Sequence, residues 1–336
     1  MSKILVTGGA GFIGSHTVIE LVNAGYEPII VDNYSNSDPS VLDGIRAILG
    51  RKVKSYEGDC NDKSFMRDVF KIENPDGVIH FAAFKAVGES VEKPLDYYQN
   101  NIGSLIVLLE TMKKFDCANL VFSSSCTVYG SPDSLPVTES SPVKEAMSPY
   151  GFTKQVSEVI IRDTVRSDQS LSAIALRYFN PIGAHPTAKI GELPLGVPAN
   201  LIPFVTQTAA GLRKELTVFG TDYNTPDGSN IRDYIHVVDL AKAHVKTIAY
   251  LTNNDQLYDV VNVGTGQGSS VLEVVKAFQK VTGVALNYRV GERRPGDVEQ
   301  VYASVDKSHE MLGWEAEFSM EDALEDAWRW QQTLKR

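Results

Sequence analysis

The first 32 residues constrain the fold of this chain more than any other segment. A short apolar run, Lys3–Thr7, leads directly into a glycine-rich segment, Gly8–Gly14. The helical pattern of Ser15–Asn23 follows, and then a second apolar run, Pro28–Asp32. The order of strand, glycine turn, helix and strand predicts the first unit of a doubly wound parallel sheet.

The glycines of this turn have spacings that are typical of dinucleotide-binding sites. Gly9, Gly11 and Gly14 fit G-x-G-x-x-G, and Gly8, Gly11 and Gly14 fit G-x-x-G-x-x-G. Such glycines allow a tight turn, and they let backbone N–H groups approach a pyrophosphate at the helix N-terminus. The second apolar run ends in Asp32, which is placed to accept hydrogen bonds from the adenosine ribose and would repel a 2′-phosphate. The sequence therefore predicts NAD rather than NADP as the cofactor.

Alternating strand and helix patterns continue to about residue 180. Further strands are expected at 53–59, 77–83, 119–125 and 171–179, and right-handed crossovers would join them into one parallel sheet. Ligands of such sheets lie outside the carboxyl ends of the strands. After residue 180 the pattern loosens into short strands and amphipathic helices. We therefore expect an α/β protein: a Rossmann, doubly wound parallel sheet that binds NAD at 1–180, and a smaller mixed α/β substrate-binding lobe at 181–336, with some segments returning to the first domain.

Tyr150 and Lys154 are four residues apart in a segment that has the start signals of a helix. Ser148 suits a cap, Pro149 suits the first turn, and apolar residues follow at helical intervals. A spacing of four places the phenol and the ammonium on one helix face. A nearby cation favours the phenolate and so suits tyrosine to general acid–base catalysis. The spacing is also common by chance on helices, so its meaning depends on the glycine-rich segment.

Composition and charge exclude several classes of protein. The chain has 336 residues, of which 43% are hydrophobic, enough for a large core. No apolar stretch approaches the roughly 20 residues of a membrane helix, and a strand that begins at Lys3 leaves no room for a secretory signal. A formal net charge of −10 opposes non-specific nucleic-acid binding. We expect a cytoplasmic protein that binds neither membrane nor nucleic acid.

The cysteines and histidines do not predict a metal site. The three cysteines, Cys60, Cys117 and Cys126, lack metal-ligand spacing and are expected to be reduced thiols. His80 and His236 occur in apolar runs, which favours core or turn positions over metal ligation. We therefore assign no metal.

Several segments together resemble the extended short-chain dehydrogenase/reductases that act on nucleotide sugars. They are Thr7–Gly14, Ser123–Gly130, Tyr150 with Lys154, and Arg177–His185. Within this family the chain is similar to the 4-epimerases, to which His80–Ser90, Tyr97–Asn101 and Gly228–His236 add further similarity. The resemblance extends from residue 3 to the tryptophan-containing C-terminal helix.

The resemblance implies reversible C4 epimerisation of UDP-glucose and UDP-galactose through a transient 4-keto sugar and NADH. Tyr150 would move the proton of the sugar 4-hydroxyl, Ser125 would hydrogen-bond the same oxygen, and Lys154 would lower the tyrosine pKa and bind the nicotinamide ribose. The helix expected at 94–114 is apolar on more than one face. Together with the family resemblance, this implies a homodimer.

The resemblance also implies two sets of contact residues. The cofactor set is Gly8, Gly11, Phe12, Ile13, Gly14, Asp32, Asn33, Asn36, Asp59, Cys60, Phe81, Ala82, Ala83, Lys85, Asn100, Ser125, Tyr150, Lys154 and Phe179. The substrate set is Lys85, Ser125, Tyr150, Asn180, Asn200, Thr217, Val218, Phe219, Arg232, Arg294, Asp297 and Val301. Lysine and arginine suit a pyrophosphate, although a lone arginine is often only a solvated surface charge.

Three positions depart from the usual pattern of the family: Val301, Cys126, and Phe152-Thr153 between Tyr150 and Lys154, of which the last is expected to have a small effect. Val301 is found where epimerases restricted to plain sugars tend to carry tyrosine, so the resemblance implies space near the sugar C2 substituent and acceptance of UDP-N-acetylglucosamine and UDP-N-acetylgalactosamine. The alternative is that Val301 only packs a strand. Cys126, beside Ser125, would make the protein sensitive to thiol reagents if it is accessible.

Three alternative functions share part of the pattern. Nucleotide-sugar 4,6-dehydratases typically carry Asp-Glu where this chain has Cys126-Thr127, and UDP-glucuronate decarboxylases tend to carry glutamate there. A non-catalytic NAD-binding redox sensor would give no reason for Ser125, Tyr150 and Lys154 to occur together. The sequence therefore favours epimerisation over these alternatives.

Overall fold

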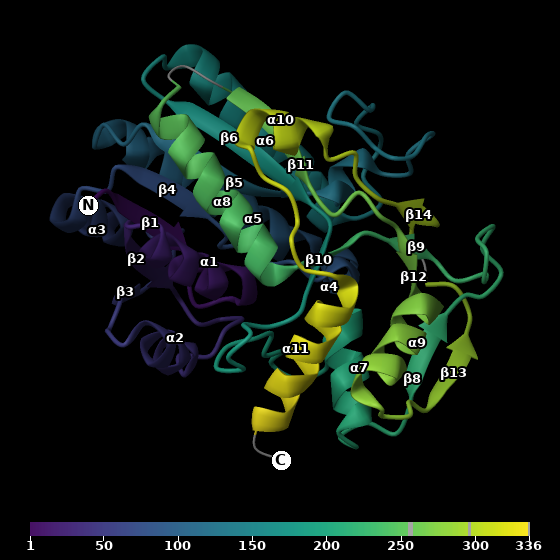
Figure 1. The fold of residues 1–336 in the computed structure, drawn as a ribbon. Coiled ribbons are helices and arrows are strands. Elements are labelled where there is room, and N and C mark those ends of the chain that lie inside the picture. Colours follow the sequence, from purple (N-terminus) through teal and green to yellow (C-terminus); the bar gives the residue numbers. More distant parts are fainter. Residues whose placement is uncertain (255–257, 295–296, 335–336) are drawn as a thin grey trace.

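The computed structural model describes residues 1–254, 258–294 and 297–334. Within these ranges the larger part of the protein is a seven-stranded parallel sheet with the order β11-β6-β5-β4-β1-β2-β3 (Figure 1). Its strands are β1 (Lys3–Thr7), β2 (Glu27–Asp32), β3 (Lys54–Glu57), β4 (Gly77–His80), β5 (Asn119–Ser125), β6 (Ser172–Tyr178) and β11 (Tyr258–Val263). The predicted doubly wound sheet is confirmed. The expected strands at 53–59 and 77–83 are shorter in the structure, because the chain turns away from the sheet to form loops at their carboxyl ends.

Helices cover both faces of this sheet. On one face α1 (Phe12–Asn23) packs against α2 (Val41–Leu49) and α8 (Val237–Thr252). On the other face α5 (Pro94–Lys114) packs between α3 (Lys63–Glu73) and α6 (Pro149–Ser167), and the short α4 (Val87–Glu92) contacts both α5 and α6. Alternate strand residues enter two separate cores: Val6 and Ile30 face α1, whereas Leu5 and Ile29 face α5. This double burial explains why the strands read as continuous apolar runs.

The strand order reverses at β1. From there the chain first adds β2 and β3 on one side and then β4, β5 and β6 on the other. A ligand crevice is expected at the carboxyl ends of β1 and β4, where these two directions separate. Helix α8 and strand β11 come from beyond residue 180 but belong to this layer, so the division of the chain at residue 180 stays a prediction.

The smaller part of the protein has a core of its own. It contains α7 (Leu201–Ala209), β8 (Leu216–Phe219), α9 (Val271–Thr282), β13 (Tyr288–Gly291) and α11 (Met320–Thr333). Strands β8 and β13 pair in parallel, and α11 packs against α7 and α9, as the lower right of Figure 1 shows.

Short strands connect the two parts. A three-stranded sheet has the order β12-β9-β14, formed by β12 (Ser269–Ser270), β9 (Ile231–Arg232) and β14 (Gln300–Val301). A second pair joins β7 (Asn180–Ile182) to β10 (Tyr234–His236). Helix α10 (Asp306–Leu312) then returns to pack against α8 and β11. The chain therefore passes more than once between the seven-stranded sheet and the smaller part.

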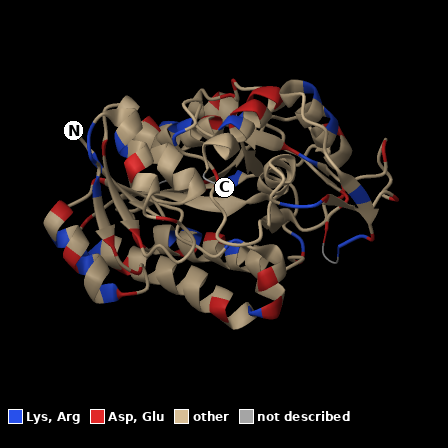
Figure 2. Ribbon diagram, turned by 90° about the horizontal axis from the view of Figure 1, so that it is seen from below, with Lys and Arg blue, Asp and Glu red and all other residues tan. Residues whose placement is uncertain are grey.

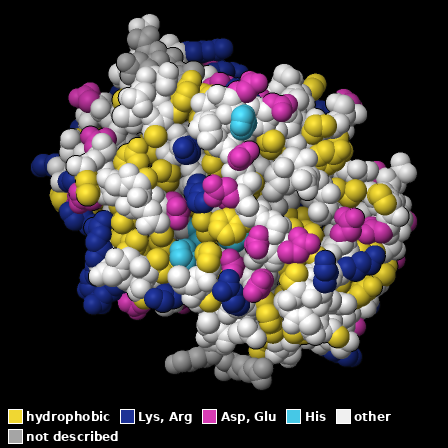
Figure 3. All heavy atoms as spheres, in the orientation of Figure 1, with side chains coloured by type: hydrophobic (Ala, Val, Ile, Leu, Met, Phe, Trp, Pro, Cys, Tyr) yellow, Lys and Arg dark blue, Asp and Glu magenta, His cyan; other side chains and the backbone are white. Residues whose placement is uncertain are grey.

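Charged side chains are concentrated on the outer helices and loops. Figure 2 shows lysine and arginine interspersed with aspartate and glutamate on these helices. The face shown in Figure 3 likewise mixes acidic, basic and apolar side chains. No helix in the described ranges combines the length and apolar character that crossing a membrane would require.

Candidate active site

The glycine turn between β1 and α1 leaves no room for a side chain at Gly8, Gly9 or Gly14. Gly8 has φ +69°, and a Cβ atom there would come within 2.8 Å of the backbone nitrogen of Ala82. A Cβ at Gly14 would collide with the carbonyl oxygen of Gly8, where α1 begins to pack against β1. The turn is therefore a backbone cradle at a helix N-terminus, an arrangement that fits a pyrophosphate.

Asp32, at the end of β2, stabilises this turn. Its side chain is 7% exposed, and one oxygen accepts a hydrogen bond from the Ala10 nitrogen at 2.9 Å. The other oxygen accepts from the Tyr34 nitrogen and the Ser37 hydroxyl, both at 2.9 Å. A carboxylate has about four acceptor positions, so Asp32 keeps capacity for one further donor. Its contact with an adenosine ribose remains a prediction.

Four further residues of the predicted cofactor set lie in the loops after β2 and β3 and on α5. Asn33 and Asn36 are exposed in the loop after β2. Asp59 accepts from the backbone and side chain of Asn61, at 2.8 and 3.0 Å, and the Asn61 amide donates to Asn100 at 3.3 Å. Two residues predicted separately, Asp59 and Asn100, thus belong to one hydrogen-bonded chain.

Cys60 has a different position from its neighbours. It is 5% exposed, it packs in the core beneath α3 and α5, and burial raises the pKa of its thiol to about 12. Only its backbone is therefore available to a cofactor. The predicted cofactor contact of Cys60 is restricted to its backbone atoms, because its side chain points into the core.

The segment after β4 lies directly beside the glycine turn. The Phe81 nitrogen donates to the Thr7 carbonyl at 3.0 Å, and the Ala82 nitrogen donates to the Thr7 hydroxyl at 3.4 Å. Ala83 follows in the same partly buried segment. The Lys85 ammonium then forms an ion pair of 3.2 Å with Glu192, which comes from the loop after β7. The predicted Phe81–Ala83 segment thus lies beside the glycine turn that leads into α1, and Lys85 is paired with the loop after β7.

Helix α6 presents Tyr150 and Lys154 to the end of β5. The Ser148 hydroxyl accepts from the Gly151 nitrogen at 3.1 Å, which confirms the predicted helix cap. The Ser125 side chain lies close enough to the Tyr150 hydroxyl to lower its pKa. The Lys154 ammonium donates to the carbonyl oxygen of Ser123 at 2.6 Å and lies 5.8 Å from the centre of the Tyr150 ring. The three residues predicted to be catalytic are brought together.

The ionisation of this pair differs from the sequence-based expectation. Burial raises the pKa of Tyr150 to about 12, against the opposing effect of the Ser125 hydrogen bond. Burial also lowers the pKa of Lys154 to about 7, against the opposing effect of Glu158. Burial outweighs any lowering of the Tyr150 pKa by Lys154 in this structure, because a buried site penalises phenolate and ammonium alike.

The residues predicted for the uridine side come from three segments of the chain. The Arg294 guanidinium donates to Asp297 at 3.0 Å and lies 4.9 Å from the centre of the Phe219 ring. Arg232 donates to the Ile231 carbonyl at 2.8 Å. Arg232, Arg294 and Asp297 all act on the pKa of Tyr234, which places them around one residue.

Four other predicted substrate residues have different surroundings. Asn200 donates to Glu192 at 2.6 Å, and the Asn180 nitrogen donates to the Asp233 carbonyl at 3.0 Å. Thr217 is partly buried in β8. Val218 is 1% exposed and packs in the core of the smaller part. As a substrate contact Val218 can offer only its backbone, because alternate residues of β8 point inward.

An apolar wall closes the site between the two parts. Val301 and Phe179 are each 5% exposed and pack with Val128, Tyr129, Val137 and Ala303. Cys126 is partly buried against the same cluster, and burial raises the pKa of its thiol to about 11. A thiol with a raised pKa is a weak nucleophile at neutral pH, so this environment does not favour reactivity of Cys126.

Sequence reasoning missed three residues that organise the site. Ser123 binds the Lys154 ammonium, and its place in a run of three serines was the available signal. Glu158 follows Lys154 by four residues on α6, a spacing that could have identified it. Glu192 joins Lys85 to Asn200, and no local pattern indicates it because its partners are distant in the sequence.

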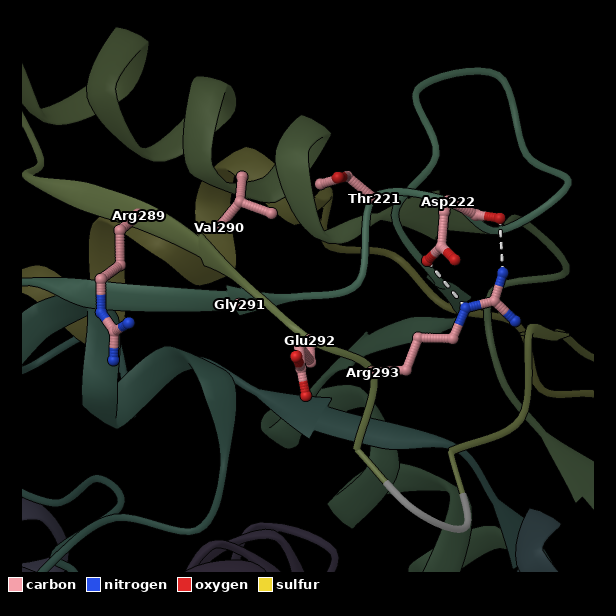
Figure 4. A pocket seen from close by; sticks show the side chains of 7 residues that line it. All are labelled: Thr221, Asp222, Arg289, Val290, Gly291, Glu292 and Arg293. Carbon is pink, nitrogen blue, oxygen red and sulfur yellow. Dashed lines mark hydrogen bonds and ion pairs between the residues drawn. The ribbon is translucent and has the colours of Figure 1, made fainter.

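A shallow pocket lies next to the uridine side rather than within it. Its lining includes Thr221, Asp222 and the segment 289–293 (Figure 4). The Arg293 guanidinium is paired with the Asp222 side chain at 2.8 Å, as the dashed line in Figure 4 marks. Among the described residues, no group of three or more histidine, cysteine, aspartate or glutamate side chains is placed to hold a metal ion.

Comparisons with known proteins agree with this geometry. A family model described as GDP-mannose 4,6 dehydratase matches residues 5–327. UDP-glucose 4-epimerase 2 of Arabidopsis thaliana is 50% identical over 331 residues, which cover 98% of this chain and 94% of that protein. UDP-glucose 4-epimerase of Bacillus subtilis is 50% identical over 328 residues, which cover 98% of this chain and 96% of that protein.

A solved structure is similar throughout the chain. The UDP-glucose 4-epimerase of Bifidobacterium longum, solved in complex with NAD+ and UDP, has a TM-score of 0.96 and 50% identity, with 98% of each chain covered. The family model spans dehydratases, but Cys126 and Thr127 provide none of the carboxylates that dehydration requires. With half of its residues shared with epimerases over nearly its whole length, this chain belongs to the UDP-glucose 4-epimerases of the extended short-chain dehydrogenase/reductase family.

Proposed function

We propose that this protein interconverts UDP-glucose and UDP-galactose by inverting C4 of the sugar, with NAD as a tightly retained cofactor. The observation that carries the proposal is the meeting of Tyr150, Ser125 and Lys154 at the carboxyl end of β5, where the doubly wound sheet binds its ligands. The Gly8–Gly14 cradle and Asp32 fit the pyrophosphate and ribose of NAD, which supplies a hydride acceptor and donor for C4.

The residues of the chain would supply the proton transfers. The Tyr150 oxygen takes the proton of the 4-hydroxyl when the sugar is oxidised, and returns it to the same oxygen when the keto sugar is reduced. Ser125 donates to that oxygen and orients it, and Lys154 stabilises the phenolate of Tyr150. Arg294, Arg232 and Asp297 would hold the diphosphate and ribose while the keto sugar turns its other face to the cofactor.

Incubation with UDP-galactose tests this function. The purified protein, with no NAD added, is expected to form UDP-glucose until the two sugars reach equilibrium, because the cofactor is restored in every cycle. Accumulation of a 4-keto product would support a dehydratase instead. Retention of NAD without any turnover would support the redox-sensor alternative and contradict the proposal.

We further propose that UDP-N-acetylglucosamine and UDP-N-acetylgalactosamine are substrates. Val301 pairs with Arg232 in the β14–β9 ladder and packs against the apolar wall that contains Phe179 and Cys126. A valine there leaves out the ring and hydroxyl that a tyrosine would place beside the sugar C2 substituent. The kcat/KM for acetylated and plain sugars, measured in the wild type and in Val301→Tyr, checks this. The variant should lose the acetylated substrate selectively, and a wild type inert on that sugar would contradict the proposal.

A homodimer is proposed from the surface of α5 and α6. These helices pack against each other, yet Leu95, Ile106, Phe152 and Val159 are 43–77% exposed on them. A second copy of the same pair would cover these apolar side chains across a two-fold axis. Light scattering at micromolar concentration is expected to give the mass of a dimer, and a monomer would contradict the assignment.

A further inference from the structure

Helix α6 meets strand β5 through three residues at a spacing of four. Ser125 lies close enough to Tyr150 to lower its pKa, and Lys154 donates to the Ser123 carbonyl. One turn further on, the Glu158 carboxylate accepts from the Ser124 hydroxyl at 2.5 Å. Each serine of the run 123–125 thus interacts with one of these three residues of α6. Glu158 lies on the same helix face as the two candidate catalytic groups, Tyr150 and Lys154.

Glu158 is a buried carboxylate with a buried cationic partner. It is 6% exposed, and Arg177 on β6 donates to both of its oxygens, at 2.9 and 2.6 Å. Arg177 is itself 4% exposed and lies 4.9 Å from the centre of the Tyr129 ring. Two parallel bonds from a guanidinium fix the position of a carboxylate as well as its charge.

We propose that Glu158 is a positioning residue of the epimerisation, which keeps Lys154 as an ammonium ion beside Tyr150 while Ser124 and Arg177 fix its carboxylate. The inference rests on the proposed function, because it assigns a task to Lys154 in that reaction. No other part of the α6 face supplies a negative charge in the described structure: the groups around Lys154 on this helix are Tyr150 and Glu158.

The side chains that β4, β5 and β6 contribute near Lys154 do not replace Glu158 in this role. From β5 it meets the Ser123 oxygens and, at 4.9 Å, the face of the Phe122 ring. From β4 it faces His80, whose pKa burial lowers to about 3, so that this ring is neutral near pH 7. From β6, Tyr178, whose pKa burial raises, interacts with Ser123, and the Arg177 cation pairs with Glu158.

The proton balance of the Tyr150–Lys154 pair shows what Glu158 changes. Below a pH of about 7 both groups carry a proton, and above it the pair shares one. That single proton lies either on Tyr150, which leaves a neutral amine, or on Lys154, which leaves the phenolate that acts as base. A carboxylate one turn from Lys154 favours the second arrangement, and it also raises the pH at which the pair loses its first proton.

Glu158→Gln tests the inference through the pH profile of turnover. The amide keeps the shape and a hydrogen-bond acceptor but removes the charge. The acid limb of kcat should move to lower pH by about one unit, and the plateau should fall about ten-fold, because the active arrangement of the proton is less populated. Glu158→Asp keeps the charge, and its acid limb should stay near that of the wild type.

Glu73→Gln is a matched control for the loss of a buried carboxylate. Glu73 on α3 is 1% exposed and accepts from Lys54 at 3.1 Å and from Lys3 at 3.3 Å, and it lies beside β3, at the sheet edge far from β5. Its substitution should lower the melting temperature without moving the acid limb. Since Glu158→Gln leaves Arg177 without its carboxylate, the double variant Glu158→Gln/Arg177→Met provides a second measurement if the single variant does not fold. The acid limb of the double variant should also move to lower pH, but by less than in Glu158→Gln.

The outcomes separate this inference from the proposed function. A wild-type protein without epimerase activity would contradict the function itself. If the wild type is active but the acid limb does not move in folded Glu158→Gln or in Glu158→Gln/Arg177→Met, only the role of Glu158 is contradicted. Glu158 would then be a structural residue.

Discussion

The two halves of the candidate site are built in different ways. The proton-transfer half lies where α6 meets β5, and its Lys154 and Ser125 are 4% and 7% exposed. The uridine half gathers Phe219, Arg232 and Arg294 from segments far apart in the sequence, and the Arg294 side chain is 51% exposed. One half is set by the register of a single helix on a single strand, whereas the other depends on how several segments are joined.

The two halves have different functional requirements, which explain this difference. Proton transfer requires groups within hydrogen-bond distance before the reaction begins, and burial on regular elements fixes them there. A sugar nucleotide must enter and leave, and its sugar must turn, so its binding groups lie on loops and short strands at the surface. Substitutions in the first half should therefore act on kcat, and those in the second half mainly on KM.

Tyr150→Phe should have the largest effect. The variant keeps the ring that packs beside Lys154 and removes the oxygen that we propose moves the proton. General acid–base catalysis contributes about 10²–10⁴-fold, so kcat should fall by that order while NAD remains bound. Turnover of UDP-galactose and the NAD content of the purified variant measure the two effects. Near-normal epimerisation would overturn the assignment of Tyr150.

Asp233→Asn should disturb the uridine half from a distance. The Asp233 carboxylate is fully buried between β9 and β10 and accepts from Thr265 at 2.7 and 2.8 Å, from Gly266 at 3.1 Å and from Ala303 at 3.2 Å. These bonds connect β9, which carries Arg232, to the segment after Val301. An amide can satisfy only part of this set, so the free energy of unfolding should fall by about 2 kcal/mol.

The split between KM and kcat shows which half Asp233 supports. The KM for UDP-galactose should rise several-fold with a smaller change in kcat, because Arg232 and β14 shift together. Denaturant unfolding measures the stability, and steady-state kinetics measure the split. A fall in kcat at unchanged KM would show that the two halves are not separable in the way proposed here.

Arg294→Lys should have a smaller effect, confined to binding. The guanidinium bonds to Asp297 and packs over the Phe219 ring, and lysine reproduces neither the fork nor the flat contact. We expect KM for UDP-galactose and the inhibition constant of UDP to rise about ten-fold, with kcat within a factor of two. Arg289→Lys is a suitable control, since Arg289 is a neighbouring surface residue that pairs only with Glu215 in the described structure.

The same contrast explains what the sequence could predict. The strand and helix around Gly8–Gly14 and the cap at Ser148 are local patterns, and both were confirmed, as was the parallel sheet that they begin. The joining of Lys85 to Asn200 through Glu192 was not predictable, because it depends on loops that meet only in the folded chain. The inward direction of Val218 and Cys60 was missed for a related reason: a family motif marks a position, but burial decides whether its side chain or its backbone faces the ligand.

The smallest effect should be seen with thiol reagents at Cys126. Burial raises the pKa of this thiol to about 11, so its thiolate fraction at pH 7.5 is very small and grows about ten-fold for each pH unit below that pKa. Alkylation by iodoacetamide should therefore be slow at neutral pH and should accelerate as the pH rises towards 10, and bound UDP should slow it further by covering the apolar wall. Mass spectrometry of Cys126 at a series of pH values, with and without UDP, measures this. Rapid modification at pH 7 would mean that the wall beside Ser125 opens in solution, and the proton-transfer half would then be less rigid than its burial indicates.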